Sequence, residues 1–195
     1  PSPAFELFAE GEFHGNTFTL IAAVDLNGFI EPACKCVFRK RSATDADPAR
    51  GTVDTEMFLS WIQNSLCPTL GHSASNQPRS IVVMDNATIH RDDRIQAAIE
   101  AVGATVIWTA AYSPDLNPIE RCFSYYKKYL LRHSRLFARR PKEAHRRALC
   151  CVSGKTMRNL YNGKALQGAI KHVYTEEDEQ TAVVLGAVVA ALVCD

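Results

Sequence analysis

Residues 80–109, SIVVMDNATIHRDDRIQAAIEAVGATVIWT, contain the clearest secondary-structure signals of the chain. Its two ends, Ser80–Met84 and Thr105–Thr109, are short apolar runs of the kind that form buried strands. Between them, residues 92–102 have apolar side chains at helical spacing, and Gly103 ends the pattern. The order strand, helix, strand predicts a parallel βαβ unit with a right-handed crossover.

Upstream of this unit, the sequence predicts a hairpin and a helix. Thr17–Val24 is β-branched and apolar, Asn27-Gly28 is a strong hairpin turn signal, and Phe29–Phe38 predicts the returning strand. Residues 39–53 are polar and predict a loop. Asp54 or Thr55 can cap the helix that follows.

Downstream of the βαβ unit, a turn-rich loop leads into another helix. Asn117 can serve as its N-cap and Pro118 as its first residue. One side of this helix is apolar and consists of Ile119, Cys122, Phe123, Tyr126 and Leu130. A hairpin followed by alternating helices and strands predicts a mixed α/β layer fold.

Composition excludes several classes of protein. The chain has 195 residues, of which 47% are hydrophobic and 22% charged, so it is not wholly disordered, collagenous or a coiled coil. No basic and apolar leader follows Pro1, so we expect no secretory signal, and the chain to be a fragment. The apolar run 182–194 is shorter than the ~20 residues of a membrane span. It therefore predicts a packing helix or strand and no membrane partner.

Charge is unevenly distributed along the chain. The net charge is only +1, but residues 121–172 contain 14 Lys and Arg and a single acid, Glu143. Such a block favours a polyanionic partner, with a solvated helical surface as the alternative.

The seven cysteines form no Cys-x-x-Cys pair. Cys34 and Cys36 would share one face of a strand, an arrangement that suits a metal. We favour buried, reduced thiols of an intracellular protein.

Two acidic residues are candidates for chemistry. Asp85 directly follows the first strand of the βαβ unit, and Glu120 lies one turn into the helix after the second strand. Each has a structural alternative: Asp85 can cap the next helix or accept loop amides, and Glu120 can form a capping box with Asn117. Because both follow the carboxyl ends of neighbouring parallel strands, they can converge on one divalent cation.

Two strings carry a family resemblance, Val82-Val-Met-Asp-Asn-Ala-Thr-Ile-His90 and Ala111-Tyr-Ser-Pro-Asp-Leu-Asn-Pro-Ile-Glu120. They resemble the catalytic domain of Tc/mariner-type DDE transposases, of the DDE superfamily endonucleases, over roughly residues 15–135. The resemblance implies an α/β fold with an RNase H-like mixed sheet, an antiparallel hairpin plus a parallel βαβ unit flanked by helices. It implies a catalytic core over residues 1–135 and a basic helical extension with an acidic, apolar tail over 136–195.

By this resemblance, Asp85 and Glu120 are catalytic and bind Mg²⁺ or Mn²⁺, two ions in an intact family member, for DNA strand cleavage and transfer. DNA is the implied partner, the nucleus the implied location, and a homodimer the implied assembly. His90 is expected to orient Asp85 or its loop. The other residues that support the motif are Asn86, Pro114, Asn117 and Pro118. The residues expected to contact DNA are Arg121, Lys127, Lys128, Arg132, Arg135, Arg139 and Arg140.

One departure from the family limits this prediction. The first Asp of the family triad, on a strand ahead of the hairpin, has no counterpart here. Asp25 lies in the hairpin turn, and Glu6, Glu10 and Glu12 are weak substitutes. We therefore expect an N-terminally truncated chain that is a poor catalyst or none, with a non-catalytic nucleic-acid-binding remnant as the alternative. An unrelated RNase H-like nuclease or a plain α/β domain fits the two strings less well.

Overall fold

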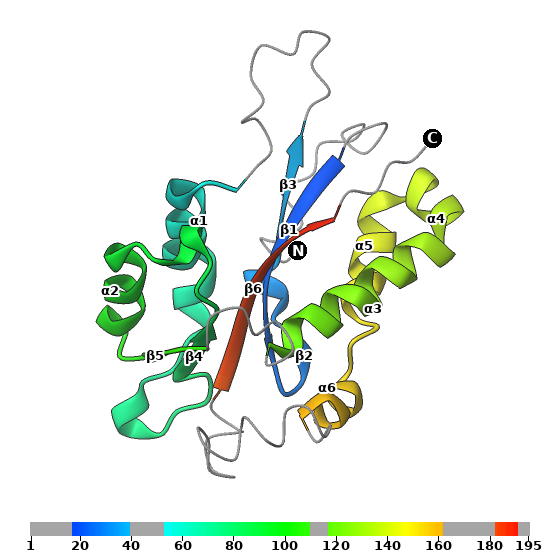
Figure 1. Cartoon of the computed structure of the whole chain (residues 1–195). Helices are drawn as coiled ribbons and strands as arrows, with labels where there is room; N and C mark the ends of the chain where they lie inside the picture. Colours follow the sequence, from blue (N-terminus) through cyan, green and yellow to red (C-terminus); the bar gives the residue numbers. More distant parts are fainter. Residues whose placement is uncertain (1–16, 40–52, 110–116, 162–181, 191–195) are drawn as a thin grey trace, which may run out of the picture.

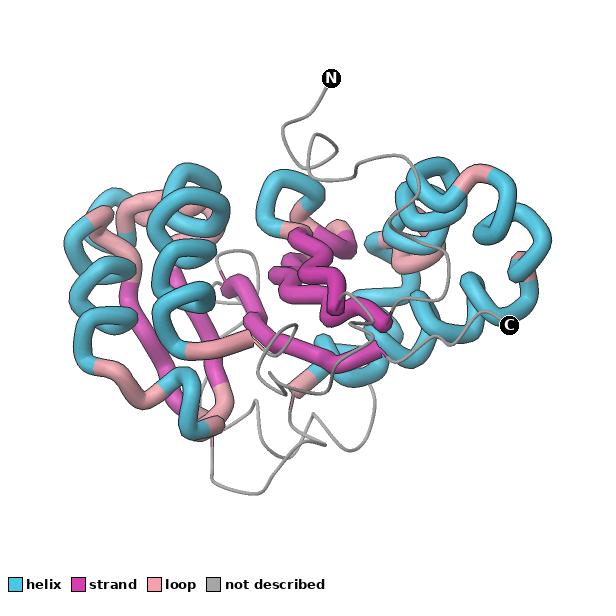
Figure 2. The backbone as a smooth tube through the Cα atoms, turned by 90° about the horizontal axis from the view of Figure 1, so that it is seen from above, coloured by secondary structure: helices cyan, strands magenta, loops and turns pink. Residues whose placement is uncertain are grey.

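The computed structural model describes residues 17–39, 53–109, 117–161 and 182–190. They form a mixed six-stranded sheet between two layers of helices (Figures 1 and 2). The strand order is β2-β1-β6-β4-β5, and β3 also pairs with β1. The strands are β1 (Thr17–Asp25), β2 (Gly28–Phe29), β3 (Lys35–Arg39), β4 (Ile81–Met84), β5 (Thr105–Trp108) and β6 (Ala182–Ala190).

The helices lie on both sides of this sheet. One layer consists of α1 (Thr55–Trp61), a π-helical turn (Ile62–Leu66) with a short 3-10 extension, and α2 (Asp93–Ala101). The other consists of α3 (Pro118–Arg132), α4 (Ser134–Arg139), α5 (Pro141–Leu149) and α6 (Gly154–Tyr161). No helix in the described ranges is long and apolar enough to cross a membrane.

The hairpin forms, but the prediction of one returning strand over Phe29–Phe38 is wrong. That segment is divided into β2 and β3 by a 3-10 turn, Glu31–Ala33. Pro32 has no N–H to donate to the ladder and is suited to the first turn of a helix. The tight turn before β2 needs glycine, because Gly28 has a φ of 121° and an added Cβ would lie 2.2 Å from the carbonyl oxygen of Val152.

The βαβ unit is confirmed. Strands β4 and β5 pair in parallel from Ile81↔Thr105 to Met84↔Trp108, and α2 lies between them in sequence. The expectation that both strands are buried holds only for β4. Strand β5 forms the edge of the sheet, so its side chains are half-buried or exposed.

The apolar run near the C-terminus forms the centre of the sheet. Strand β6 pairs antiparallel with β1 and parallel with β4, and Figure 1 shows it between them. The resemblance implies a sheet without its first strand, whereas here β6 closes the gap between β1 and β4. Its many valines suit a strand more than a helix. The division of the chain at residue 135 stays a prediction, although β6 belongs to the sheet.

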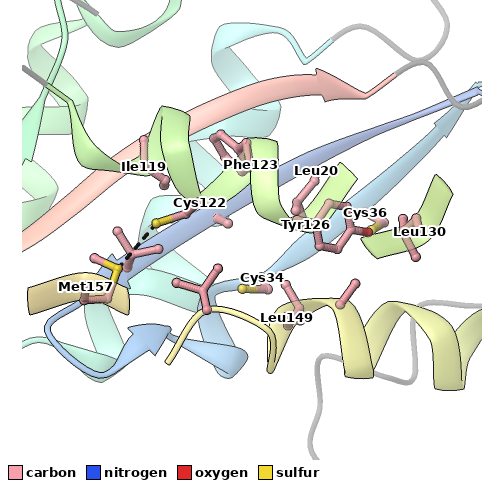
Figure 3. Packing of buried hydrophobic residues seen from close by; sticks show 14 of the residues in the cluster. Leu20, Cys34, Cys36, Ile119, Cys122, Phe123, Tyr126, Leu130, Leu149 and Met157 are labelled. Atoms are coloured by element: carbon pink, nitrogen blue, oxygen red, sulfur yellow. Dashed lines mark hydrogen bonds between the residues drawn. The ribbon is translucent and has the colours of Figure 1, made fainter. Parts of the chain in front are cut away.

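Two hydrophobic clusters join the sheet to its helical layers. Alternation along β1 sends Leu20 toward α3 and Ile21 toward α1. The apolar side of α3 is buried as the sequence predicts, and Figure 3 shows it packed over β1. The opposite side of α3 therefore faces solvent.

Candidate active site

Asp85 is held at the carboxyl end of β4. The backbone N–H of Thr109 donates to the carbonyl oxygen of Met84 (2.8 Å). The Asn86 side chain donates from Nδ2 to the carbonyl oxygen of Thr109 (2.8 Å). These two bonds join the exits of β4 and β5. They fix the backbone on both sides of Asp85, whose side chain is 40% exposed.

The Asp85 carboxylate is positioned by its own loop. His90 Nδ1 lies 2.7 Å from Asp85 Oδ1, and the backbone N–H of Ala87 donates to the same oxygen (3.1 Å). The hydrogen bond from His90 lowers the pKa of Asp85, against the partial burial that raises it. Asp85 is therefore ionised at neutral pH. Its second oxygen, Oδ2, accepts no hydrogen bond from the described residues.

His90 is itself fixed by packing. Its ring is buried and stacks on Phe58 of α1, with ring centroids 4.5 Å apart. Nδ1 faces two acceptors, the carbonyl oxygen and Oδ1 of Asp85, so we assign the proton to that nitrogen. Nε2 is buried and has no hydrogen-bond partner among the described residues. The ring thus holds the carboxylate of Asp85 in one orientation.

The alternative roles of Asp85 are settled by its contacts. It does accept a loop amide, from Ala87. It does not cap the next helix, since the N-cap of α2 is Asp92, whose side chain accepts from the N–H of Arg94 (2.9 Å).

Glu120 is brought to the site by the start of α3. Asn117 is the N-cap, accepting from the N–H of Ile119 (3.3 Å), and Pro118 is the first helical residue, as the sequence predicts. In the part of the chain that the structure describes, the half-buried Glu120 carboxylate accepts no hydrogen bond. The side-chain contact that would make a capping box is therefore not formed.

The two acids influence each other. Burial raises the pKa of Glu120, and the negative charge of Asp85 raises it further, while Lys127 acts in the opposite direction. The charge of Asp85 therefore acts on Glu120, which lies in the first turn of α3. A divalent cation between the carboxylates would replace this repulsion by attraction to both.

Asp25 is not part of this site. Strand β1 runs antiparallel to β6, and β6 runs parallel to β4. The carboxyl end of β1 therefore lies at the opposite end of the strands from Asp85. There, Asp25 Oδ2 accepts from Nε of Arg79 at 2.9 Å. Among the residues described, no group of three or more His, Cys, Asp or Glu is arranged to hold a metal ion. The described site thus contains two acids. Pro114 and the three N-terminal glutamates lie outside the described residues.

The basic residues expected to contact DNA lie on α3, α4 and the turn after them. All are exposed except Lys127, which is half-buried and whose charge reaches Glu120. Arg140 also contacts Glu143 (3.4 Å). Further exposed cations of the basic block 121–172 lie on α5 and α6, namely Arg146, Arg147, Lys155 and Arg158. The sequence assigned them to a polyanionic partner only as part of this block, and the structure adds that their side chains are exposed.

The thiols of Cys34 and Cys36 are core groups. Cys34 donates to the carbonyl oxygen of Ile30 (3.3 Å), and Cys36 Sγ lies 3.6 Å from Nε2 of the buried His145. Burial raises the pKa of Cys36 and lowers the pKa of His145 to about 4. Both side chains are therefore uncharged at neutral pH.

Comparison with known proteins gives a family match. Residues 48–142 match the family model described as DDE superfamily endonuclease, and this range includes Asp85, His90 and Glu120. No curated protein and no solved structure matches the chain. The family match supports the DDE endonuclease superfamily and, through it, a nuclease-like or transposase-like activity on DNA.

Proposed function

We propose that this chain, whose residues 48–142 match the DDE superfamily endonucleases, uses Asp85 and Glu120 to act on phosphodiester bonds of DNA with a divalent cation. The observation that carries the proposal is the placement of the two acids, Asp85 at the end of β4 and Glu120 in the first turn of α3 after β5, and the charge of Asp85 raises the pKa of Glu120 in addition to burial. They follow two parallel strands whose exits are joined by hydrogen bonds.

The available oxygens fit Mg²⁺ or Mn²⁺. Both ions prefer carboxylate oxygens and bind with only one or two carboxylates, plus water and phosphate oxygens. Asp85 offers Oδ2, while His90 and Ala87 hold Oδ1 in place. A bound cation supplies a Lewis acid that polarises a phosphate oxygen and lowers the pKa of water.

This chain's own residues would contribute in distinct ways. His90 keeps Asp85 ionised and oriented, so little reorganisation is needed when the cation arrives. Glu120 has a raised pKa, so cation binding competes with a proton there and strengthens as the pH rises. The cations on α3 and α4 would hold the DNA backbone beside the acids.

We extend the proposal to the Tc/mariner type, to an RNase H-like sheet and to strand cleavage and transfer in the nucleus. Support comes from the two motif strings and from the 34 residues that separate Asp85 from Glu120. The antiparallel hairpin joined to a parallel βαβ unit is compatible with that fold. A homodimer is part of the same extension and rests on the resemblance alone.

A second candidate function is DNA binding without cleavage. One observation favours it: among the described residues no third acid is grouped with Asp85 and Glu120 to hold a metal ion, and Asp25 is paired with Arg79 at the opposite end of the strands. Two carboxylates can hold one ion but leave a second ion weakly bound.

Mn²⁺ titration calorimetry tests the metal site. We expect wild type and Asp93→Asn, which changes an exposed acid of α2, to bind alike. Asp85→Asn and Glu120→Gln should each bind at least about tenfold more weakly, since each removes a charged ligand. Wild-type affinity in both variants would contradict the proposed site.

Nicking of supercoiled plasmid with Mn²⁺ then separates the two candidate functions. Cleavage by wild type that is lost in Asp85→Asn supports the endonuclease. Salt-dependent DNA binding with no cleavage, equal in wild type and Asp85→Asn, supports the non-catalytic function.

A further inference from the structure

The solvent-facing side of α3 has a regular pattern. Arg121, Tyr125, Lys128 and Arg132 are all exposed and are spaced four, three and four residues apart. Residues with this spacing lie on one face of a helix. We call these four residues the α3 stripe. It begins one residue after Glu120, so it leads directly to the candidate active site.

Tyr125 is the unusual member of the stripe. It is 43% exposed, although its neighbours Phe123 and Tyr126 are buried under the other side of α3. The core therefore does not require an aromatic residue at position 125. Among the described residues, the Tyr125 ring stacks on no other ring and its hydroxyl makes no hydrogen bond. It is a free aromatic surface flanked by cations.

The surroundings of the stripe favour an anionic ligand. Within α3 to α6 the acids are Glu120, at the candidate site, and Glu143, which already contacts Arg140 and Arg147. No acid of these helices therefore lies on the stripe itself. Three cations at helical spacing suit the phosphates of a nucleic acid backbone.

An exposed aromatic ring adds information about the form of that nucleic acid. In a duplex both faces of each base are covered by neighbouring bases, so a tyrosine ring on the surface can stack only at an unpaired base. Aromatic rings along a basic groove are the usual means of holding single strands.

Resting on the proposed function, we propose that the α3 stripe binds single-stranded DNA next to the bond held at Asp85 and Glu120. Arg121, Lys128 and Arg132 contact its phosphates, and one unpaired base stacks on Tyr125. Tyr125 is five residues from Glu120, about 7.5 Å along the helix axis at ~1.5 Å per residue. Five residues are also about 140° of rotation at 3.6 residues per turn, so the stacked base lies on a face of α3 beside Glu120 and not directly over it.

Fluorescence anisotropy with a labelled oligonucleotide and its duplex tests the stripe. The assay contains EDTA, so it does not depend on a cation at the acids. Tyr125→Ala should weaken single-strand binding by about tenfold, the cost of losing one stacked base. Tyr125→Phe keeps the ring and should bind as wild type. Leu131→Ala changes an exposed apolar residue of α3 outside the stripe and should have no effect.

The comparison of the two DNA forms decides the inference. Duplex binding should be unchanged in Tyr125→Ala, because the phosphate contacts remain. Equal weakening for both forms, or no weakening for either, would overturn it. Failure of the proposed function is seen separately, as wild-type Mn²⁺ binding by Asp85→Asn and Glu120→Gln while the oligonucleotide results stand.

Discussion

An aspartate with the same local hydrogen bond lies at each of the two opposite ends of the sheet's strands, but its surroundings differ. Asp25 is the last residue of β1, and Asp85 is the first residue after β4. The carboxylate of each accepts a hydrogen bond from the backbone N–H two residues further on. At Asp25 the second carboxylate oxygen faces the guanidinium of Arg79, and the residue is 7% exposed. At Asp85 the second oxygen has no cation among the described residues, and Glu120 adds a second negative charge nearby.

Tertiary neighbours therefore determine whether an acid at a strand end is paired with a cation or left without one. Asp25 is neutralised by a residue 54 positions away, so its charge stabilises the fold. Asp85 is left with an unmet demand for positive charge. Surface shape alone would favour a site near Asp25, because a hollow of about 480 Å³ is lined by Asp25, Asn27 and Arg79. Charge balance is the better guide to the site here.

The largest expected effect on stability belongs to Asp25. Asp25→Ala removes two hydrogen bonds to an ionised and nearly buried carboxylate, so we expect a loss of about 2–3 kcal/mol in the free energy of unfolding. Asp85→Ala is the matched variant at the opposite end of the strands. It should lower the free energy of unfolding by less, since the Asp85 side chain is 40% exposed. Urea denaturation measures both. The comparison breaks if Asp85→Ala destabilises the chain more than Asp25→Ala.

The next effect concerns the orientation of Asp85. His90→Phe keeps a ring on Phe58 but has no N–H, so it removes the hydrogen bond that lowers the pKa of Asp85, and Mn²⁺ binding should weaken by about tenfold. Asp85 binds a cation only as a carboxylate, so Mn²⁺ binding is lost as the pH falls through the pKa of Asp85. Removing the hydrogen bond from His90 raises this pKa and therefore moves the acidic limit of Mn²⁺ binding to higher pH. Calorimetry from pH 4 to pH 7 follows the shift.

A control separates orientation from simple loss of packing. Phe58→Leu disturbs the ring beneath His90 and leaves its hydrogen bond to Asp85 available. If both variants lose stability but only His90→Phe shifts the pH profile of Mn²⁺ binding, positioning of the carboxylate is the cause. An unchanged profile in His90→Phe would remove that role.

The smallest effect on stability is expected at Glu120, where substitution should raise the free energy of unfolding, whereas Asp25→Ala should lower it. The raised folded-state pKa favours the fold below the unfolded pKa, and this contribution is lost as the pH rises through the folded pKa. Without metal, Glu120→Gln should therefore stabilise the chain at pH 7 by about a few tenths of a kcal/mol, because solvent screens a half-exposed charge.

Thermal melts with and without Mn²⁺ check this sign. The advantage of Glu120→Gln should disappear near pH 4, and added Mn²⁺ should raise the melting temperature of wild type more than that of the variant. A variant that is less stable than wild type at pH 7 without metal would show that Glu120 has a cation partner.

Local signals in the sequence predicted much of the fold. Asp54 and Asn117 are N-caps as expected, and each acts on a backbone N–H group within three residues. The βαβ unit and the apolar side of α3 follow from periodicity within one segment. The division of the returning strand at Pro32 was also readable locally, because proline cannot donate to a ladder.

What the sequence did not reveal depends on contacts between distant segments. The position of β6 requires Phe18 to pair with Ala190, and no local pattern encodes that. The pairing of Asp25 with Arg79 is equally non-local. The positions of Asp85 at the exit of β4 and of Glu120 at the start of α3 were predicted from local patterns, and their convergence on one cation stays a prediction. The exposed ring of Tyr125 was missed, although its spacing from Arg121 and Lys128 was visible.

The central place of β6 has a consequence for biosynthesis. Strands β1 and β4 leave the ribosome long before residues 182–190 do, so their inner edges stay unpaired until the last part of this sequence is made. Closure of the sheet therefore waits for β6 and is a step of high contact order. Until β6 is made, the nascent chain exposes two unpaired strand edges, which favours aggregation.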